Sequence, residues 1–456
     1  MNSQPPFTTV YIPSRSYGRF LEEAIESVLR QSIDRWELLL FDEASEDETA
    51  DVIRNYDGHP QIRSFRTDVI GMPAINNLAL REAKGEFIMR LDADDVLEEN
   101  ALLVLENALL KQQDAALAFP DYYLVDQDGR AFRHESRSSL YSENHLFDRP
   151  PNGACTLIRT SVLKAIGGYR EDLGAQDGLD LWTKLAREHR SINIGLPLFY
   201  YRRHGTNLTN RVERIFNARK QIKRDAMLPR LKANEPIIAI IPCREHYDFE
   251  TNAWSLKLDK SSLLERSIRS CLDVDFFDYV IVTCDNVDVR DTMARFDDPR
   301  LHFVERPTDS TPRSLSVVPT LQNAIEKFDP EHRGVVLVRY VQAPFVQPST
   351  LEEAIATLLL SDADSAFPVE QLKSPVYRRG PYGLECLNPE RPISTDFDTI
   401  YIERPTCLGT RSRNFSSGSL TGVRVANFEV QRKECFFVDS NHSLRIAQVM
   451  DNENSD

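Results

Sequence analysis

Residues 8–15, TTVYIPSR, form a short β-rich run, and residues 36–42, WELLLFD, form a second run that is apolar almost throughout. Between them, residues 20–31, FLEEAIESVLRQ, place their apolar side chains at helical spacing. A strand, a helix and a second strand with continuous apolar residues are typical of a parallel sheet that helices cover on both faces. We therefore predict an α/β domain that begins at the start of this chain.

The same order of segments begins again in the second half of the chain. Residues 236–244, PIIAIIPCR, form a β-rich run, residues 263–272, LLERSIRSCL, have helical spacing, and residues 278–285, DYVIVTCD, fit a buried strand. The repetition predicts two α/β domains of similar class.

Between these domains, residues 212–236 are basic, polar and helix-prone, which is typical of a connecting helix. The last residues, DNENSD, have the composition of a disordered tail. The predicted limits are a first domain at residues 1–210, a helical linker at 211–235, a second domain at 236–450 and a disordered tail at 451–456.

The composition is that of an ordinary globular protein. Of 456 residues, 41% are hydrophobic and 27% are charged. The net charge of −15 argues against nucleic acid as a partner, because such proteins cluster Lys and Arg. No run approaches the roughly 20 apolar residues of a membrane span. The first residues, MNSQPPFTTVYIP, lack the basic start and apolar core of a signal peptide, so we expect a cytoplasmic protein without an integral membrane segment.

The seven cysteines are scattered and include no CxxC pair. An odd, dispersed set predicts buried reduced thiols, and neither a disulfide framework nor a zinc site.

Polar residues follow three predicted strands of the first domain. They are Pro13, Ser14 and Arg15, then residues 42–45, DEAS, and then residues 92–95, DADD. Because ligands of open α/β sheets bind at the carboxyl ends of the strands, these residues are candidates for one binding site.

The group at residues 92–95 is the strongest of the three signals. Carboxylates that crowd one strand end repel one another unless a cation lies among them. Mg²⁺ and Mn²⁺ prefer oxygen ligands and share their shell with substrate phosphates, so a divalent ion here would neutralise a diphosphate leaving group. The alternative is a solvated acidic cluster that caps the following helix, residues 96–110.

The order of segments resembles the family-two glycosyltransferases of the GT-A fold. The resemblance covers about residues 7–210 and rests on four segments in family order. They are residues 10–49 (the nucleotide-binding opening), 71–95 (leading to the D-x-D motif), 153–186 (the acceptor side) and 198–209 (the closing motif). It implies an N-terminal Rossmann-like GT-A domain that takes a nucleotide-sugar donor and a glycan or glycoprotein acceptor, with Mn²⁺ or Mg²⁺ as cofactor.

The resemblance also implies roles for donor-side residues. Pro13, Ser14 and Asp42 would line the nucleotide pocket, with Asp42 reading the base. Asp92 would contact the ribose or the metal, and Asp94 would bind the metal. His204 matches a position that commonly meets the metal or the diphosphate, although it could equally be a polar loop residue.

On the acceptor side, Asp177 matches the family's catalytic base, and Asp180 is the second candidate. A carboxylate there would deprotonate the attacking hydroxyl, which predicts inversion in a single displacement. Trp182 would pack near the acceptor. The alternatives are that both Asp residues form a helix N-terminus, where acidic side chains are favoured, and that Trp182 belongs to the core.

One position departs from the family. The segment GMPAINN usually carries an Arg after its Ala, which reaches towards the donor phosphates, and here Ile75 stands in its place. An aliphatic side chain supplies no charge. Either another cation compensates, or the donor binds more weakly or differs from the common uridine diphosphate sugars. The candidate cations are Arg15, Arg90, Arg202 and Arg203.

The second half resembles the sugar-acid cytidylyltransferases that make CMP-activated nonulosonic acids and CMP-Kdo, over about residues 236–450. The segments concerned are residues 236–244, 258–285, 336–355, 361–380, 397–406 and 434–450. The resemblance implies a nucleotidyltransferase-like fold, and proteins of this fold often form homodimers.

Two departures of the second domain fall at catalytic positions. A glycine-rich basic loop should follow the first strand to hold the CTP phosphates, but residues 242–262 contain no glycine. Arg244 persists there, and Lys257 or Lys260 could serve as a second cation. The closing segment usually offers two carboxylates to a metal, whereas this chain has Asp439 and then Asn441. We therefore predict a degenerate domain that has lost nucleotidyl transfer.

Three functions are compatible with these residues. The first is an inverting glycosyltransferase with a degenerate partner domain. The second is a bifunctional enzyme whose C-terminal domain activates a sugar acid with CTP. The third is a scaffold that binds sugar nucleotides without catalysis, against which the retained carboxylates argue, because such a cluster costs free energy without a metal.

Overall fold

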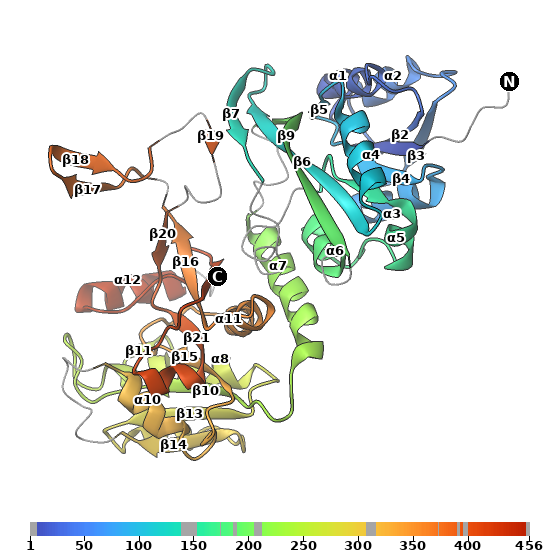
Figure 1. Cartoon of the computed structure of the whole chain (residues 1–456). Helices are drawn as coiled ribbons and strands as arrows, with labels where there is room; N and C mark the ends of the chain where they lie inside the picture. Colours follow the sequence, from blue (N-terminus) through green and yellow to red (C-terminus); the bar gives the residue numbers. More distant parts are fainter. Residues whose placement is uncertain are drawn as a thin grey trace. The chain divides into compact units, whose positions relative to one another are not determined.

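The structure is a computed structural model of the chain, and it describes residues 7–137, 153–173, 175–185, 189–204, 212–306, 316–372, 374–389, 393–394 and 400–452. The chain forms two compact units (Figure 1). The first comprises Met1–Arg219 with Pro375–Thr399, and the second comprises Lys220–Ser374 with Ile400–Asp456. Both units are α/β, which confirms the predicted fold class.

The first unit is built on a mixed sheet whose main path runs β19-β7-β6-β8-β4-β1-β2-β3, with β5 and β9 off this path. The strands are β1 (Thr8–Ser14), β2 (Trp36–Glu43), β3 (Ile62–Thr67), β4 (Phe87–Arg90), β5 (Val96–Leu97), β6 (Ala115–Val125), β7 (Ala131–Glu135), β8 (Leu157–Arg159), β9 (Arg190–Arg202) and β19 (Ile393–Ser394). The helices are α1 (Gly18–Leu29), α2 (Thr49–Arg54), α3 (Met72–Glu82), α4 (Ala101–Lys111), α5 (Thr160–Ala165) and α6 (Asp177–Leu185). A separate hairpin consists of β17 (Tyr377–Gly380) and β18 (Gly383–Cys386).

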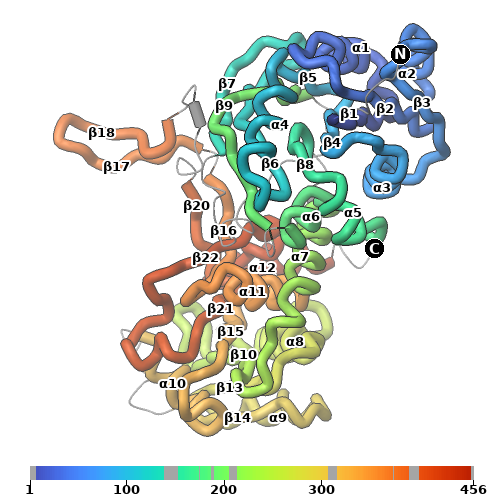
Figure 2. The backbone as a smooth tube through the Cα atoms, turned by 45° about the vertical axis from the view of Figure 1, so that its right-hand side comes forward, coloured from blue at the N-terminus to red at the C-terminus, as the bar shows by residue number. Residues whose placement is uncertain are grey.

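The strand pairing places the predicted polar segments at one edge of this sheet. Strands β1, β2, β3 and β4 pair in parallel, so their carboxyl ends lie together. Strand β9 pairs in parallel with β6, and the two strands lie side by side in the tube of Figure 2. The sequence predicts β1, α1 and β2 correctly, because their apolar residues repeat at the spacing of buried strands and of a one-sided helix.

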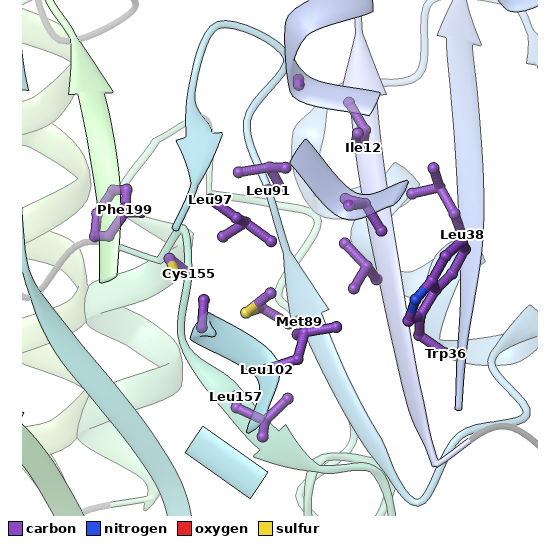
Figure 3. Packing of buried hydrophobic residues seen from close by; sticks show 14 of the residues in the cluster. Ile12, Trp36, Leu38, Met89, Leu91, Leu97, Leu102, Cys155, Leu157 and Phe199 are labelled. Carbon is purple, nitrogen blue, oxygen red and sulfur yellow. The ribbon is translucent and has the colours of Figure 1, made fainter. Parts of the chain in front are cut away.

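The core of the first unit lies between the sheet and helices α1 and α4. Figure 3 shows Ile12 and Leu38 on two neighbouring strands, with Met89 and Leu102 nearer to the centre of the cluster. Each of these four side chains is almost completely buried. The cluster packs against the strands that carry the polar segments at their carboxyl ends. It therefore fixes the positions of those strand ends.

Gly85 is required where the chain enters β4. A Cβ atom there would lie 2.5 Å from the Thr9 nitrogen and 2.7 Å from the Phe87 oxygen, which are backbone atoms of two paired strands. We expect Gly85→Ala to lower the free energy of unfolding by about 1–3 kcal/mol, because strand atoms cannot move aside cheaply. Chemical denaturation would measure the loss, with the exposed neighbour changed in Lys84→Ala as the control. Equal stability of the two variants would contradict this explanation.

The second unit contains a mixed sheet in the order β14-β13-β10-β15-β21-β16-β20, and β22 pairs with β16. Its strands are β10 (Ile237–Pro242), β13 (Tyr279–Cys284), β14 (Leu301–Glu305), β15 (Val335–Arg339), β16 (Ser365–Gln371), β20 (Tyr401–Glu403), β21 (Cys407–Arg411) and β22 (Val425–Glu429), and a small ribbon joins β11 (Lys257–Leu258) to β12 (Ser261–Ser262). The helices are α8 (Leu263–Leu272), α9 (Val289–Met293), α10 (Val318–Ile325), α11 (Pro348–Leu360) and α12 (Asn441–Asn452), together with the part of α7 (Val212–Met227) from Lys220 onwards. Short 3₁₀ turns lie at Leu228–Arg230, Ala253–Ser255 and Ser412–Ser417.

Helix α7 occupies the segment that the sequence predicts as a helical linker. From Lys220 onwards it belongs to the second unit. The Lys223 Nζ atom lies 2.9 Å from Glu353 Oε1 of α11, and both side chains are fully buried. Lys220 Nζ similarly lies 3.2 Å from Glu434 Oε1, again with both side chains buried. This part of the helix is therefore packed into the second unit, and does not form a solvated connection.

Two further observations differ from the predicted limits of the domains. Residues 375–399 are assigned to the first unit, because β19 pairs with β7. Of the tail that the sequence predicts as disordered, Asp451 and Asn452 instead end α12, and both Asp451 carboxylate oxygens contact Arg266. Residues 453–456 lie outside the described residues. Among the helices that the structure describes, none has the length and apolar composition to cross a bilayer.

Candidate active site

The turn at residues 92–95 follows β4 and carries three carboxylates at the carboxyl edge of the sheet. The Asp95 nitrogen donates to the Asp92 carbonyl at 3.0 Å and closes the turn. Asp95 is fully buried, whereas the side chains of Asp92 and Asp94 are 25% and 11% exposed. Burial, together with the charges of Asp94 and Asp177, raises the pKa of Asp92 to about 6, although Arg90 acts in the opposite direction. The first two carboxylates are therefore the ones that a ligand can reach.

His204 meets this turn from the end of β9. Its Nε2 atom lies 2.9 Å from Asp94 Oδ2. The imidazole stacks on Phe20 at a centroid distance of 5.2 Å, and Tyr17 approaches it edge-on at 5.7 Å. The structure therefore brings together the two predicted metal ligands, which are 110 residues apart in the sequence.

Asp177 is the first residue of α6 and belongs to the same site. Arg90 Nη1 donates to Asp177 Oδ2 at 2.6 Å, and Asn76 Nδ2 donates to the same oxygen at 2.8 Å. The Arg90 Nε atom lies 2.9 Å from Asp92 Oδ1. Arg90 thus links the predicted base to the first carboxylate of the D-x-D motif. Because both hydrogen bonds reach Oδ2, Asp177 can present Oδ1 to an acceptor hydroxyl.

The other two acceptor-side predictions have different environments. Asp180 is 5% exposed, and its carboxylate lies 2.8 Å from Lys184 one turn further along α6. Trp182 is 1% exposed and packs edge-on against Phe119 at a centroid distance of 4.9 Å. The Trp182 indole is therefore part of the core, as in the alternative interpretation, and its predicted place near the acceptor stays a prediction.

The predicted donor residues lie on adjacent strands. Ser14 on β1 is opposite Asp42 on β2, and both are buried. Asp42 Oδ1 accepts from the Ser45 nitrogen at 2.9 Å, while Arg66 of β3 lies 3.6 Å from Oδ2. Pro13 pairs with Phe41 one step earlier in the register, and Arg15 is exposed just beyond the end of β1.

The four candidate cations for the charge that Ile75 lacks lie in different environments. Ile75 is 1% exposed and belongs to the core of the unit. Of the four candidates, Arg90 is the one whose described ion pairs join it to both Asp92 and Asp177. Arg202 is buried against the backbone of the turn, and Arg15 and Arg203 are exposed.

A divalent ion fits this site if the protein supplies only part of its coordination shell. Within the described residues, no group of three or more His, Cys, Asp or Glu side chains could enclose a metal. Asp94 and His204 together provide a carboxylate oxygen and an imidazole nitrogen 2.9 Å apart. Mg²⁺ and Mn²⁺ commonly take one or two protein ligands and complete their shell with substrate phosphates and water. The two residues fit an ion of that kind.

Several residues of this site are absent from the sequence prediction. Asn76 holds Asp177, Phe20 and Tyr17 hold the His204 ring, and Glu23 pairs with Arg202 at 2.6 Å. Asn76 directly follows Ile75 in the segment 71–95, which already belongs to the family resemblance. Its place in the sequence could therefore have marked it as a site residue. Phe20 and Glu23 looked like ordinary residues of an amphipathic helix.

The three candidate residues of the second unit are not joined to one another by any described contact. The Arg244 guanidinium lies 5.0 Å from the centroid of the Tyr247 ring, and Lys257 is exposed on β11. Asp439 follows Val438, whose nitrogen donates to the Gln342 carbonyl at 2.8 Å, so it lies near the carboxyl end of β15. Its Oδ1 atom accepts from the Ser443 hydroxyl at 3.0 Å, in the first turn of α12.

Two family models match the chain in separate segments. Residues 9–166 match the family described as Glycosyl transferase family 2, and residues 256–383 match the family described as Cytidylyltransferase. The chain therefore joins a segment of each family, which confirms both resemblances.

Two curated relatives each match part of the chain. Chondroitin synthase of Escherichia coli is 23% identical over 203 residues, which are 44% of this chain and 30% of that protein. Hyaluronan synthase of Pasteurella multocida is 29% identical over 203 residues, which are 44% of this chain and 21% of that protein. The chain thus spans less than a third of the length of these relatives. Among solved structures, S. aureus TarS 1-349 in complex with UDP-GlcNAc aligns with a TM-score of 0.42 and 17% identity, covering 49% of this chain and 68% of that one.

Proposed function

We propose that this chain, with its family 2 glycosyltransferase segment joined to a cytidylyltransferase segment, is a metal-dependent inverting glycosyltransferase. It would move a sugar from a nucleoside diphosphate donor to a hydroxyl of a glycan or glycoprotein, in surface polysaccharide synthesis. The observation that carries the proposal is the single constellation of Asp92, Asp94, His204 and Asp177, in which Arg90 links Asp92 to Asp177.

The positions of the carboxylates suggest the roles of the protein groups. Asp177 Oδ1 takes the proton of the acceptor hydroxyl, while Arg90 and Asn76 hold the other oxygen. The acceptor oxygen then attacks the anomeric carbon from the face opposite the diphosphate, which inverts its configuration. Asp94 and His204 would hold Mn²⁺ or Mg²⁺, and the ion supplies positive charge to the departing diphosphate. Pro13, Ser14 and Asp42 bind the nucleoside, with Asp42 accepting from the base.

Thermal unfolding of the wild type and of Asp94→Ala would test the donor site. Each protein is heated with Mn²⁺ and one of UDP, GDP, CDP, CTP or CMP. A ligand at a hundred times its Kd stabilises the native state by about 2.7 kcal/mol. We expect one nucleoside diphosphate to raise the melting temperature of the wild type and to have little effect on Asp94→Ala. The responding diphosphate would also identify the base.

Two other results would redirect the proposal. If CTP or CMP alone stabilises both proteins equally, the working nucleotide site belongs to the second unit, as a bifunctional enzyme would require. If a nucleotide sugar stabilises the wild type but no sugar is transferred to any acceptor or to water, the non-catalytic scaffold is the better hypothesis. The configuration of the transferred sugar, followed by NMR, tests inversion separately.

We propose that the second unit no longer transfers nucleotides. The loop at residues 242–262 has no glycine to wrap phosphates closely, and Asn441, where a second carboxylate is expected, is an exposed residue of α12. Asp439 itself accepts a hydrogen bond at the start of α12, which is a structural use of that carboxylate. Pyrophosphate release from CTP with a panel of sugar acids is the test. Release above the background without enzyme would refute this proposal and favour the bifunctional hypothesis.

A further inference from the structure

Arg202 connects the closing strand of the first unit to the backbone of the D-x-D turn. Its side chain is 3% exposed, and its Nε atom donates to the Asp94 carbonyl oxygen at 2.9 Å. Its own backbone nitrogen donates to Asp95 Oδ1 at 3.0 Å. Arg202 thus holds Asp94 through its side chain and Asp95 through its main chain.

The burial of Asp95 costs free energy, which indicates that the hydrogen bond of its carboxylate has a structural role. It is fully buried, and its second oxygen, Oδ2, has no hydrogen-bond partner among the described residues. Burying a carboxyl group with one unsatisfied oxygen costs free energy. The bond that it does make fixes the end of β9 beside the turn, and His204 is the second residue after that end.

Besides donating to the Gln127 carbonyl at 3.1 Å, Arg202 contacts two residues of α1, Phe20 and Glu23. Its guanidinium carbon lies 5.1 Å from the centroid of the Phe20 ring, on which the imidazole also stacks. Nη2 donates to Glu23 Oε2 on the same helix, α1, at 2.6 Å. Arg202 therefore contacts both elements that hold the Asp94–His204 pair, which are the turn on one side and α1 on the other.

We propose that Asp95 and Arg202 are positioning residues that set the affinity of the Asp94–His204 pair for its divalent ion. We call these two residues the bracket. They act through Asp94 and His204, whose mutual distance and orientation they fix. The inference rests on the proposed function, because it assumes that Asp94 and His204 are the metal ligands.

Titration with Mn²⁺, followed by the electron paramagnetic resonance signal of the free ion, measures that affinity without any turnover. The disruptive variants are Arg202→Met and Asp95→Ala. We expect each to raise the half-saturating concentration of the Asp94-dependent Mn²⁺ site by about 10–100-fold, the usual effect of losing a residue that supports a metal ligand. Arg202→Lys keeps one donor, and Asp95→Asn keeps one acceptor oxygen, so these conservative variants should recover much of the affinity.

Two matched variants separate positioning from general stability. Arg63 of β3 also donates to carboxylates, of Glu37 and Glu82, and to a carbonyl. Asp121 of β6 is also buried and accepts a backbone N–H, from Arg137, at 2.7 Å. Arg63 is 31% exposed, so Arg63→Met should lower the melting temperature less than Arg202→Met does, whereas Asp121→Ala should lower it about as much as Asp95→Ala. Both control variants should leave the Mn²⁺ affinity unchanged.

The outcomes distinguish failure of the inference from failure of the proposed function. If Asp94→Ala weakens Mn²⁺ binding but the bracket variants, conservative ones included, bind Mn²⁺ like the wild type, the inference is overturned and the metal site stands. If Asp94→Ala and the wild type bind Mn²⁺ equally, the metal ligands of the proposed function are wrong, and the bracket inference falls with them. A loss of affinity in the matched controls equal to that in the bracket variants would also overturn the inference.

Discussion

Replacing Asp177 with Asn should lower kcat of glycosyl transfer by about 10²–10⁴-fold, the range attributed to general base catalysis. The amide is close in shape to the carboxylate and can still accept the hydrogen bonds of Arg90 and Asn76 at its oxygen. It cannot take a proton from the acceptor hydroxyl. Because the amide keeps the contact with Arg90, and so the link to Asp92, the KM for the donor should change little. Initial rates over a range of donor and acceptor concentrations would measure both constants.

Asp180→Asn is the matched control for this prediction. Asp180 lies one turn further along α6, is buried and pairs with Lys184, so its loss should reduce stability more than catalysis. If Asp180→Asn loses as much activity as Asp177→Asn while remaining folded, the base is Asp180, the second candidate. If neither variant loses activity, the proposed single displacement has no base in this helix, and the mechanism would have to be revised.

The sequence predicts the framework of the site because its elements are defined locally. The apolar run at residues 36–42 and the helical spacing of residues 20–31 each specify one element without reference to distant residues. The carboxylates of residues 92–95 come directly after the end of another such run in the sequence. Parallel pairing then brings their strand end beside Ser14 and Asp42, as expected for the carboxyl edge of the sheet.

The interactions that join these residues are not encoded locally. Asn76 reaches Asp177 over 101 positions in the sequence, and Arg90 reaches it over 87. Which oxygen each donor meets depends on how α3 and α6 pack at the end of the sheet. For the same reason the sequence leaves four candidates to compensate for Ile75, and the ion pairs of Arg90 distinguish it from the others.

Helix α7 shows the same limit in the second unit. Its composition is basic and polar, which correctly predicts a helix but does not show what the helix packs against. The partners of Lys220 and Lys223 are Glu434 and Glu353, which lie 214 and 130 residues further along the chain. Periodicity within one segment cannot show that its lysines are buried against carboxylates so far away. The predicted linker thus becomes part of the second unit from Lys220 onwards.

Lys223→Met should destabilise the second unit by about 3–5 kcal/mol, because removing one member of a buried ion pair leaves an uncompensated charge. Both side chains of the Lys223–Glu353 pair are fully buried, and Lys223 also donates to Thr357 at 3.0 Å. The methionine fills a similar volume, so the effect comes from the stranded Glu353 carboxylate. Denaturation of the full chain, with hydrogen exchange followed in α7 and α11, would measure the loss and locate it.

Two comparisons make this prediction specific. Lys232→Met removes a lysine that is 63% exposed and pairs with Glu235, so its effect should stay within about 1 kcal/mol. The double variant Lys223→Met with Glu353→Leu removes both charges, and we expect it to recover most of the stability, because apolar side chains of similar volume can replace a buried pair at little cost. If the double variant is instead as unstable as the single one, the loss reflects the packing or the hydrogen bond to Thr357. The stability of the α7–α11 contact would then not depend on the pairing of its charges.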